Sequence, residues 1–405
     1  MGILSKPAPE VDQPTYDVVG PIERYDMRWK GASRWSMTAG TQAYEEFYAN
    51  NPQFSKEYDE ELKLIGKRSR EYNYSIDPVN EQFVPALFVS MGIFSDRDIC
   101  VGKYKNLPTS QRPRNAPEGS DGSQLKIDPI EMSRKVKEFG KYLGAAKVRI
   151  TKLRKEWVYS HYTGRLGKEL EGKPVDDMDY EYVICMAVQH DLDMKKIGRG
   201  CAAEAEDGVR YSLASWMSTV MAEFIRCIGF RARSLPSRNA PYLVVPTFVD
   251  AGMGELGRNG LLITPEFGPR VRIAKVLTDL PLEPDQLLEL GVDRFCQSCL
   301  KCATHCPSQS IQYGDRTDKP VNISTSLGVM KWPIDAEKCL GFWARTGNSC
   351  CNCIMVCPFN KPAGRFHNSA RWLVKHLPWL DSWLVKGDDL LGYHKPVKPA
   401  DYWAS

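Results

Sequence analysis

The chain has 405 residues, of which 42% are hydrophobic, and its formal net charge is +4 at pH 7. This composition is that of a globular protein large enough for two domains, or for one large domain with an appendage. So small a charge gives no reason to expect nucleic-acid binding. With no run of about 18 apolar residues and no apolar N-terminal segment, we expect neither a membrane span nor a signal peptide.

Residues 1–120 are expected to form an N-terminal arm and a helical region that pack on the rest of the chain. Prolines interrupt residues 1–40, where Tyr25 and two tryptophans stand among basic residues. This pattern predicts an extended arm across a surface rather than a packed element. Apolar residues at helical spacing predict a helix over residues 41–70.

Helices and strands alternate over residues 121–285, which predicts an α/β domain with a central sheet and flanking helices. Asp128, Pro129 and Glu131 supply an N-cap, a first-turn proline and an early acid, so a helix is expected to begin there. The strongest helical pattern covers residues 209–229 and ends at a glycine suited to a C-cap. Strands are predicted at residues 147–152, 180–188, 242–249, 261–264 and 271–277.

A glycine-rich turn separates two of these predicted strands. It holds Gly252, Gly254 and Gly257 in G-x-G-x-x-G spacing, followed by Asn259 and a further glycine. A dinucleotide fingerprint follows a strand and opens a helix, whereas this motif stands between two strands and ends in a hairpin signal. We therefore favour a tight turn whose backbone approaches a large cofactor over a nicotinamide or flavin site. A hairpin without a ligand is the remaining alternative.

Two cysteine runs lie in residues 286–365. The first reads C-x2-C-x2-C-x3-C-P, and the second contains C-x2-C-x3-C-P. Bacterial-type ferredoxins hold two 4Fe–4S cubanes with such runs, and the fourth cysteine of each run ligates the other cluster. The predicted ligands of one cluster are Cys296, Cys299, Cys302 and Cys357. Those of the other cluster are Cys339, Cys350, Cys353 and Cys306, although a ten-residue insertion separates Cys339 from Cys350 where two residues are usual.

Structural zinc is the alternative for these cysteines, because C-x2-C pairs also bind zinc. The repeated x3-C-P endings favour iron–sulfur, and the odd total of 13 cysteines disfavours a disulfide framework. Five cysteines have no expected cluster role and are interpreted as inert thiols: Cys100, Cys185, Cys201, Cys227 and Cys351.

The order of these motifs resembles the respiratory reductive dehalogenases, corrinoid- and iron–sulfur-dependent enzymes of organohalide respiration. The resemblance rests on residues 251–272 (AGMGELGRNGLLITPEFGPRVR) and on the two cysteine runs behind them, and it covers roughly residues 120–365. It implies an α+β protein. A nitroreductase-like α/β corrinoid-binding domain (121–285) would be followed by a bacterial ferredoxin-like two-cluster domain (286–365) and an aromatic-rich extension (366–405).

The resemblance also implies a base-off corrinoid beside the nearer cluster. Its expected contacts are Gly252, Gly254, Gly257 and Asn259. A lower axial histidine from a D-x-H-x-x-G motif is not expected, because the H-x-x-G at His161 has Tyr159 in place of the aspartate.

The implied reaction replaces halogen by hydrogen in small organohalides, namely chlorinated C1–C2 alkanes or ethenes, with a Co(I) corrinoid fed by the two clusters. Tyr211 matches the family's proton donor, and Asn239 and Arg272 match the residues that polarise the site. Tyrosine is a weak acid unless a cation stabilises its phenolate, and arginine can supply that charge. Arg270, two residues earlier and hence on the same strand face, is the rival for this role.

Trp343 is expected to line the substrate cavity. The alternatives for these residues are core packing for Tyr211, surface ion pairing for Arg272 and simple packing for Trp343.

The expected partners are a membrane anchor protein and an electron donor, and a homodimer is compatible with the sequence. The aromatic-rich segment 372–384 is expected either to face such a partner or to pack as a bland helix on the cluster domain.

The expected location is the outer face of the cytoplasmic membrane, with peripheral attachment. Members of the family normally carry a twin-arginine leader, which this sequence lacks, so we expect a mature form or, alternatively, a cytoplasmic enzyme. Two other functions were considered. The first is a tRNA-modifying enzyme similar to epoxyqueuosine reductase, which also depends on cobalamin and iron–sulfur clusters. It would need more chain than the short segment after Cys357. The second is an electron-transfer ferredoxin subunit, which would not need about 290 residues before its clusters.

Overall fold

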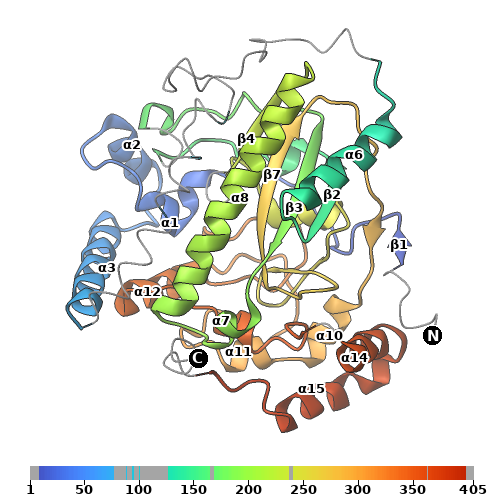
Figure 1. Cartoon of the computed structure of the whole chain (residues 1–405). Helices are drawn as coiled ribbons and strands as arrows, with labels where there is room; N and C mark the ends of the chain where they lie inside the picture. The colour runs from blue at the N-terminus through green and yellow to red at the C-terminus, as the bar shows by residue number, and fades with distance from the viewer. Residues whose placement is uncertain are drawn as a thin grey trace.

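The computed structural model describes residues 9–76, 88, 94, 100, 126–164, 168–236, 240–362 and 364–397. Figure 1 shows an N-terminal group of helices at one side, a central sheet crossed by a long helix, and C-terminal helices along the lower edge. Asn239, predicted to polarise the site, lies outside the described residues.

A four-stranded antiparallel sheet of order β2-β3-β7-β4 forms the centre of the molecule. Its strands are β2 (Lys147–Lys152), β3 (Tyr182–Gln189), β7 (Val271–Thr278) and β4 (Ala232–Leu235). The register places Ile184 opposite both Ile150 and Val276. The predictions of β2, β3 and β7 are confirmed. The four-residue strand β4 was missed because its Arg233 and Ser234 interrupt the apolar pattern.

Strand β3 is buried on both faces, as its continuous apolar run predicts. Ile184 and Met186 face a core shared with α6 (Pro129–Tyr142) and α8 (Cys201–Cys227). Val183 and Cys185 face a second core, shared with α9 (Val244–Asp250) and with Trp157 and Tyr159. The alternation follows the two-residue period of a strand. Each face of the sheet is therefore covered by different elements, and α6 and α8 lie in front of it in Figure 1.

The two predicted helix boundaries have the expected caps. The side chain of Asp128 accepts hydrogen bonds from the backbone N–H groups of Ile130 and Glu131, and α6 begins at Pro129. Gly229, at φ 95°, follows α8 in a conformation that favours glycine. Helix α8 begins at Cys201, earlier than the predicted residue 209, and its additional turns include buried acidic side chains.

Two predicted elements are wrong. The segment predicted as a strand over residues 242–249 forms α9, whose Phe248 and Val249 are buried in the core. Its β-branched composition suggested a strand, but tertiary packing overrides that preference. The single helix predicted over residues 41–70 is two helices, α2 (Gln42–Asn50) and α3 (Lys56–Ile76). Pro52 separates them, because proline disfavours helical backbone in the residue before it.

The N-terminal segment is packed rather than laid across a surface, which corrects the prediction of an extended arm. Tyr16, Tyr25 and Met27 are buried in the core on the α9 face of the sheet. Arg34 forms a buried ion pair with Asp59, with Nε and Oδ2 2.7 Å apart. The short elements of this segment are β1 (Glu10–Val11), η1 (Met27–Trp29) and α1 (Gly31–Arg34).

Several short elements connect these layers. They are η3 (Lys155–Trp157), η5 (Lys168–Leu170), α7 (Leu192–Lys196), β5 (Glu255–Leu256), β6 (Leu262–Ile263) and β8 (Leu287–Leu288). Strand β8 pairs with β1, and β5 pairs with β6 in the hairpin that the glycine-rich turn predicts.

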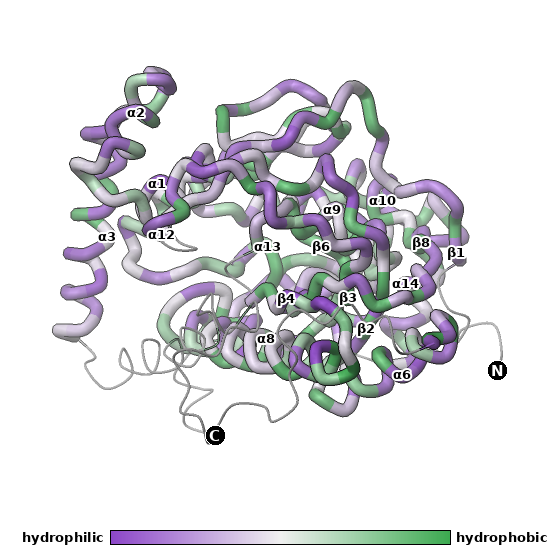
Figure 2. The backbone as a smooth tube through the Cα atoms, turned by 90° about the horizontal axis from the view of Figure 1, so that it is seen from above, coloured by the Kyte–Doolittle hydropathy of each residue, from purple (hydrophilic) through white to green (hydrophobic). Residues whose placement is uncertain are grey.

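After β8, the named elements of the described chain are helices. Its first four helices are α10 (Val292–Ser298), α11 (Lys301–Thr304), α12 (Ala336–Thr346) and α13 (Asn352–Met355). They are followed by α14 (Arg365–His376), η6 (Pro378–Leu380) and α15 (Asp381–Leu390). Helix α12 packs on α3, which stands at one edge and is largely hydrophilic in Figure 2. In the ranges given above, no helix has the length and apolar character needed to cross a bilayer.

Candidate functional site

The four cysteines predicted to hold one cluster surround a single small cavity. Cys296 lies on α10, Cys302 on α11, Cys299 between these helices, and Cys357 just after α13. The cavity has a volume of about 310 Å³, including the solvent at its open side, and all four cysteines line it. Two runs distant in sequence therefore meet around one space, as a cubane with four cysteine ligands requires.

The other four predicted ligands also come from separate elements that meet. Cys339 lies on α12 and Cys353 on α13. Burial, together with the nearby Cys350 and Cys306, raises the pKa of the Cys339 thiol to about 12. Cys302, Cys306 and Cys353 share one apolar cluster with Ile334, so the two cysteine sets are adjacent.

In the part of the chain that the structure describes, no three His, Cys, Asp or Glu side chains are grouped to hold a single metal ion. The first cysteine set surrounds one small space, as the four ligands of a cubane do.

Helix α8 and strand β7 bring Tyr211 and Arg272 together. The Arg272 guanidinium carbon lies 4.1 Å from the centroid of the Tyr211 ring. The same ring packs against Phe88, with ring centroids 5.7 Å apart. A cation over an aromatic face is attracted to the ring, and it also favours the phenolate that forms when tyrosine gives up its proton. Sequence reasoning paired these two residues for that purpose.

Asp207, one turn before Tyr211 on α8, was missed from the sequence. Its Oδ1 accepts hydrogen bonds from Lys195 Nζ, at 2.6 Å, and from Arg272 Nη2. Burial alone would raise the pKa of this carboxyl, but Arg272 and Lys195 lower it below its usual value. Asp207 is therefore ionised and holds Arg272 beside the tyrosine. The i, i+4 spacing of Asp207 and Tyr211 was the available signal, hidden because the helix was predicted to begin two residues after Asp207.

The residues at the start of α8 also hold the loop that carries the second cysteine run. The backbone N–H of Ser349 donates to Glu204 Oε2 at 3.0 Å, and that of Cys351 donates to the Gly198 carbonyl at 2.8 Å. Arg199 forms an isolated β-bridge with Cys350. The start of α8 is thus tied directly to the predicted cluster ligands.

The rival arginine has a different environment. Arg270 precedes β7, is 2% exposed, and donates from Nε to Asn360 Oδ1 at 2.9 Å and from Nη1 to the His190 carbonyl. These hydrogen bonds link the Asn360 side chain to the backbone at His190, and neither is made to Tyr211. Trp343, predicted to line the substrate cavity, lies on α12 with 39% of its surface exposed.

The glycine-rich turn has a steric reason of its own. A Cβ added at Gly252 or at Gly254 would lie well under 3.0 Å from the carbonyl oxygen of Gln286 or of Ile263, respectively. These two glycines therefore allow close approach to the chain's own backbone. Gly257 and Asn259 instead line the first cluster cavity, and Asn259 Nδ2 donates to the Cys353 carbonyl at 3.3 Å.

A larger cleft opens between the α9 face of the sheet and the segment before α12. Its volume is about 1150 Å³, including the solvent at its open mouth. Trp157, Tyr159 and α9 form one wall, and residues 324–336 contribute the other. Ile334 in that wall also packs on the cysteines of both runs. The size of the cleft and its largely apolar walls suit a large cofactor.

Buried polar groups gather beneath this cleft and were also missed from the sequence. Lys30 Nζ donates to the Tyr159 hydroxyl and lies 4.5 Å from the ring centroid, and both residues line the cleft. Lys275 is fully buried, and its Nζ donates a long hydrogen bond of 3.5 Å to the Pro236 carbonyl. The buried hydroxyl of Tyr242 has no hydrogen-bond partner among the described residues. Such groups are costly unless a partner or ligand satisfies them.

The two tyrosine–cation pairs lie on opposite faces of the sheet. Tyr211 and Arg272 are on the α8 face, where Arg272 stands opposite Val188 in the register. Tyr159 belongs to the core on the α9 face. The Tyr159–Lys30 pair was missed from the sequence, because its partners are 129 positions apart.

Comparisons with known proteins agree with this geometry. The model of the 4Fe-4S dicluster domain matches residues 295–361. The chain is 34% identical over 301 residues to the tetrachloroethene reductive dehalogenase of Sulfurospirillum multivorans, covering 68% of this chain and 60% of that relative. The chain thus spans less than two thirds of this relative's length.

Solved structures share the fold. The catabolic reductive dehalogenase NpRdhA matches with a TM-score of 0.73 at 21% identity, over 96% of this chain and 49% of that one. A second structure, of a reductive dehalogenase described in terms of B12-dependent dehalogenation, matches with a TM-score of 0.71 at 23% identity and the same coverage. With this fold, a dicluster domain and a curated relative at 34% identity, the chain belongs to the reductive dehalogenase family.

Proposed function

We propose that the chain catalyses reductive dehalogenation, R–X + 2e⁻ + H⁺ → R–H + X⁻, on small organohalides. The observation that carries this proposal is the meeting of two four-cysteine sets next to a large cleft, in a chain 34% identical to a tetrachloroethene reductive dehalogenase. Two electrons and one proton are needed for each turnover. The cysteine sets account for delivery of the electrons, and a tyrosine–cation pair accounts for the proton.

A corrinoid is the proposed cofactor of the cleft, because a solved relative is described as B12-dependent. When bound, it would supply a cobalt centre that relays electrons from the clusters to the carbon–halogen bond. Gly260, Trp157 and the hydroxyl-bearing residues 324–326 line the cleft and would hold the macrocycle and its polar side chains. Gly252, Gly254, Gly257 and Asn259 stay proposed as supports of the same region, acting through the hairpin and the adjacent cluster cavity.

Tyr211 is proposed as the proton donor, with Arg272 stabilising the phenolate and Asn239 helping to polarise the site. Contact between the Arg272 guanidinium and the Tyr211 ring supports this assignment, and Asp207 fixes the guanidinium in place. Tyr159 with Lys30 is the second candidate, because this pair lines the cleft itself, whereas Tyr211 lies on the other face of the sheet. Only one of the two can be the donor, and separate substitutions distinguish them.

The proposed substrates are chlorinated C1–C2 compounds. Such molecules offer no charge and few hydrogen-bonding groups, so shape and desolvation must select them, and the apolar walls around Trp157 and Trp332 provide both. The name of the S. multivorans relative supports the ethenes within this class. Trp343 stays proposed as a further wall of the substrate cavity.

We also propose peripheral attachment to the outer face of the cytoplasmic membrane. The proposed partners are a membrane anchor protein, an electron donor and a second copy of the chain in a homodimer.

A rate panel with reduced viologen as the electron donor tests the function and the substrate class together. Tetrachloroethene, chloroform, a trichloroethane and a chlorophenol are compared by the release of halide. We expect turnover of the C1–C2 compounds. A preference of about tenfold or more for the chlorophenol would overturn the substrate class, since so large a ratio needs a polar contact to the phenol oxygen. No halide release by protein with its full iron and corrinoid content would overturn the function.

A further inference from the structure

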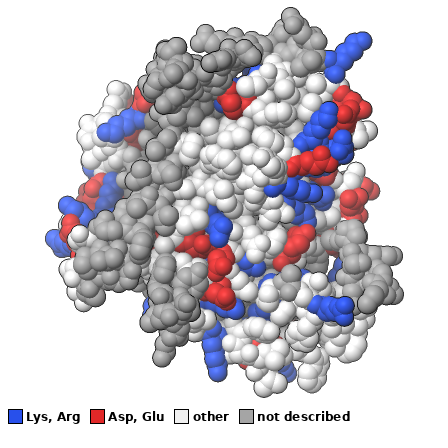
Figure 3. All heavy atoms as spheres, in the orientation of Figure 1, with Lys and Arg blue, Asp and Glu red and all other residues white. Residues whose placement is uncertain are grey.

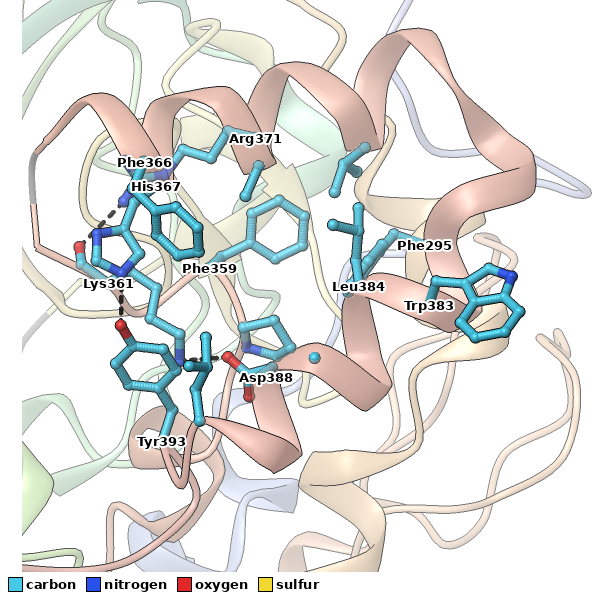
Figure 4. Close-up of a pocket in the computed structure, with 15 residues that line it drawn as sticks. Phe295, Phe359, Lys361, Phe366, His367, Arg371, Trp383, Leu384, Asp388 and Tyr393 are labelled. Carbon is cyan, nitrogen blue, oxygen red and sulfur yellow. Dashed lines mark hydrogen bonds and ion pairs between the residues drawn. The ribbon is translucent and has the colours of Figure 1, made fainter.

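The last two helices form an open apolar groove above the first cluster site (Figure 4). Its volume is about 680 Å³, including the solvent at its mouth. Its floor is Phe295 and Phe359, together with Pro358, and these residues stand next to cluster ligands in the sequence. On α14, residues spaced four apart face the groove, and residues with the same spacing on α15 face it from the other side. The helices therefore hold an apolar trough over the cluster site.

Large apolar side chains around this trough point to solvent. The exposed fraction ranges from 57% to 90% for the following residues: Phe366, Trp379, Trp383, Leu390 and Leu391. Trp383 stands away from the groove floor in Figure 4, at the outer edge of α15. An exposed apolar patch of this kind marks a surface that meets a protein or a membrane.

In this region the acidic side chains are buried or paired, whereas several basic side chains are exposed. Asp388 is buried between Lys361, whose Nζ lies 2.8 Å from Oδ1, and Lys301. Asp381 is buried against Arg294. Arg365, Lys386 and Lys395 are exposed to solvent, whereas the exposed acid, Asp389, pairs with Lys301 at 2.7 Å. The outward surface is thus apolar and basic, and the lower edge of Figure 3 is mostly uncharged with scattered blue atoms.

The lysines of this face favour a lipid surface over a protein partner. Aromatic residues and arginine are enriched at protein–protein interfaces, but lysine is depleted there. Tryptophan beside lysine and arginine on amphipathic helices is typical of elements that lie in the membrane interface, where the rings sit at the headgroup level and the cations meet anionic lipid. Lys386 illustrates the arrangement, because its Nζ lies 5.2 Å from the Trp383 ring centroid.

We infer that α14, η6 and α15 form a face that lies on an anionic lipid bilayer and turns the Cys296–Cys357 cluster site toward the membrane. A membrane-bound electron donor would then meet this cluster before the other. The inference deepens the proposed peripheral location and rests on it for its setting. Because vesicle binding is measured without turnover, its failure is distinguishable from failure of the proposed dehalogenase activity.

Flotation of the full, cluster-containing chain with vesicles tests the inference. One set of vesicles is phosphatidylcholine alone, and the other contains roughly one third phosphatidylglycerol. We expect binding to the anionic vesicles that weakens as salt is added. Exchange of both Trp379 and Trp383 for serine should lower the partition coefficient by about tenfold or more. Lys386→Gln should lower it by about fivefold, the effect of losing one cation near an anionic surface.

A matched control uses an equally exposed aromatic elsewhere. Tyr142, at the end of α6, is 86% exposed, and Tyr142→Ser should leave vesicle binding unchanged. The visible spectrum of the clusters checks that each variant is folded. The inference is overturned if the wild-type chain does not float with anionic vesicles at low salt, even if it binds a membrane protein. It is equally overturned if the tryptophan and lysine variants float as well as the wild type.

Discussion

Replacing Tyr211 with phenylalanine tests the proposed proton donor, because the change removes the hydroxyl and keeps the ring. The ring, which phenylalanine keeps, makes the contacts to Arg272, at 4.1 Å, and to Phe88, at 5.7 Å, and the visible spectrum of the clusters checks that the variant is folded. Loss of a general acid lowers turnover by about 10²–10⁴-fold. That range corresponds to about 3–5 kcal/mol of activation free energy.

The assay is anaerobic turnover with reduced viologen, analysed for kcat and KM separately. We expect kcat to fall by this range and KM to change little, because the hydroxyl acts in the transition state rather than in substrate binding. Tyr159→Phe is the matched variant, since it removes the hydroxyl of the pair on the other face of the sheet. The reasoning is refuted if Tyr211→Phe keeps turnover within about a factor of two, and a hundredfold loss in Tyr159→Phe would then assign the proton to the cleft pair.

Three further changes test separate parts of the account. Cys339→Ser should lower the iron of the reconstituted protein from about eight to about four per chain, and full iron content would show that another residue ligates the second cluster. Gly254→Ala should disrupt the hairpin and lower the cluster content, because the new Cβ meets the Ile263 carbonyl. Gly314→Ala is the control, since a Cβ there meets nothing within 4 Å. Equal melting temperatures of the two variants would contradict the steric argument. Burial lowers the pKa of Lys275 from 10.5 to about 7, so the unfolded chain binds more protons than the native chain between these values, and native stability should rise with pH there. Lys275→Met should therefore raise the melting temperature more at pH 6 than at pH 10, and an equal change at both would contradict a buried ammonium.

Patterns that depend on nearby residues were predictable from the sequence. The cysteine spacings led to two ligand sets, and one of them surrounds a cavity as expected. The apolar run of β3 and the capping residues of α6 placed those elements correctly, because burial and caps act within a few residues. The pairing of Tyr211 with Arg272 came from resemblance to a family, and the structure places the two in contact.

Features that depend on the fold were not predictable. Lys30 and Tyr159 meet although 129 positions separate them in the sequence. The glycines at 252 and 254 look like a cofactor loop in the sequence, but the atoms they must avoid belong to Gln286 and Ile263. The helix α9 forms from a segment with strand-like composition because its apolar side chains fill a core made by other elements. In each case the deciding contact is distant in sequence.

Acid extraction of anaerobically reconstituted protein tests the central claim most directly. The protein is supplied with iron, sulfide and a corrinoid, freed of unbound cofactor, and then extracted. The account predicts about one corrinoid per chain together with about eight iron. A chain that holds its full iron content but releases no corrinoid would contradict the assignment as a reductive dehalogenase.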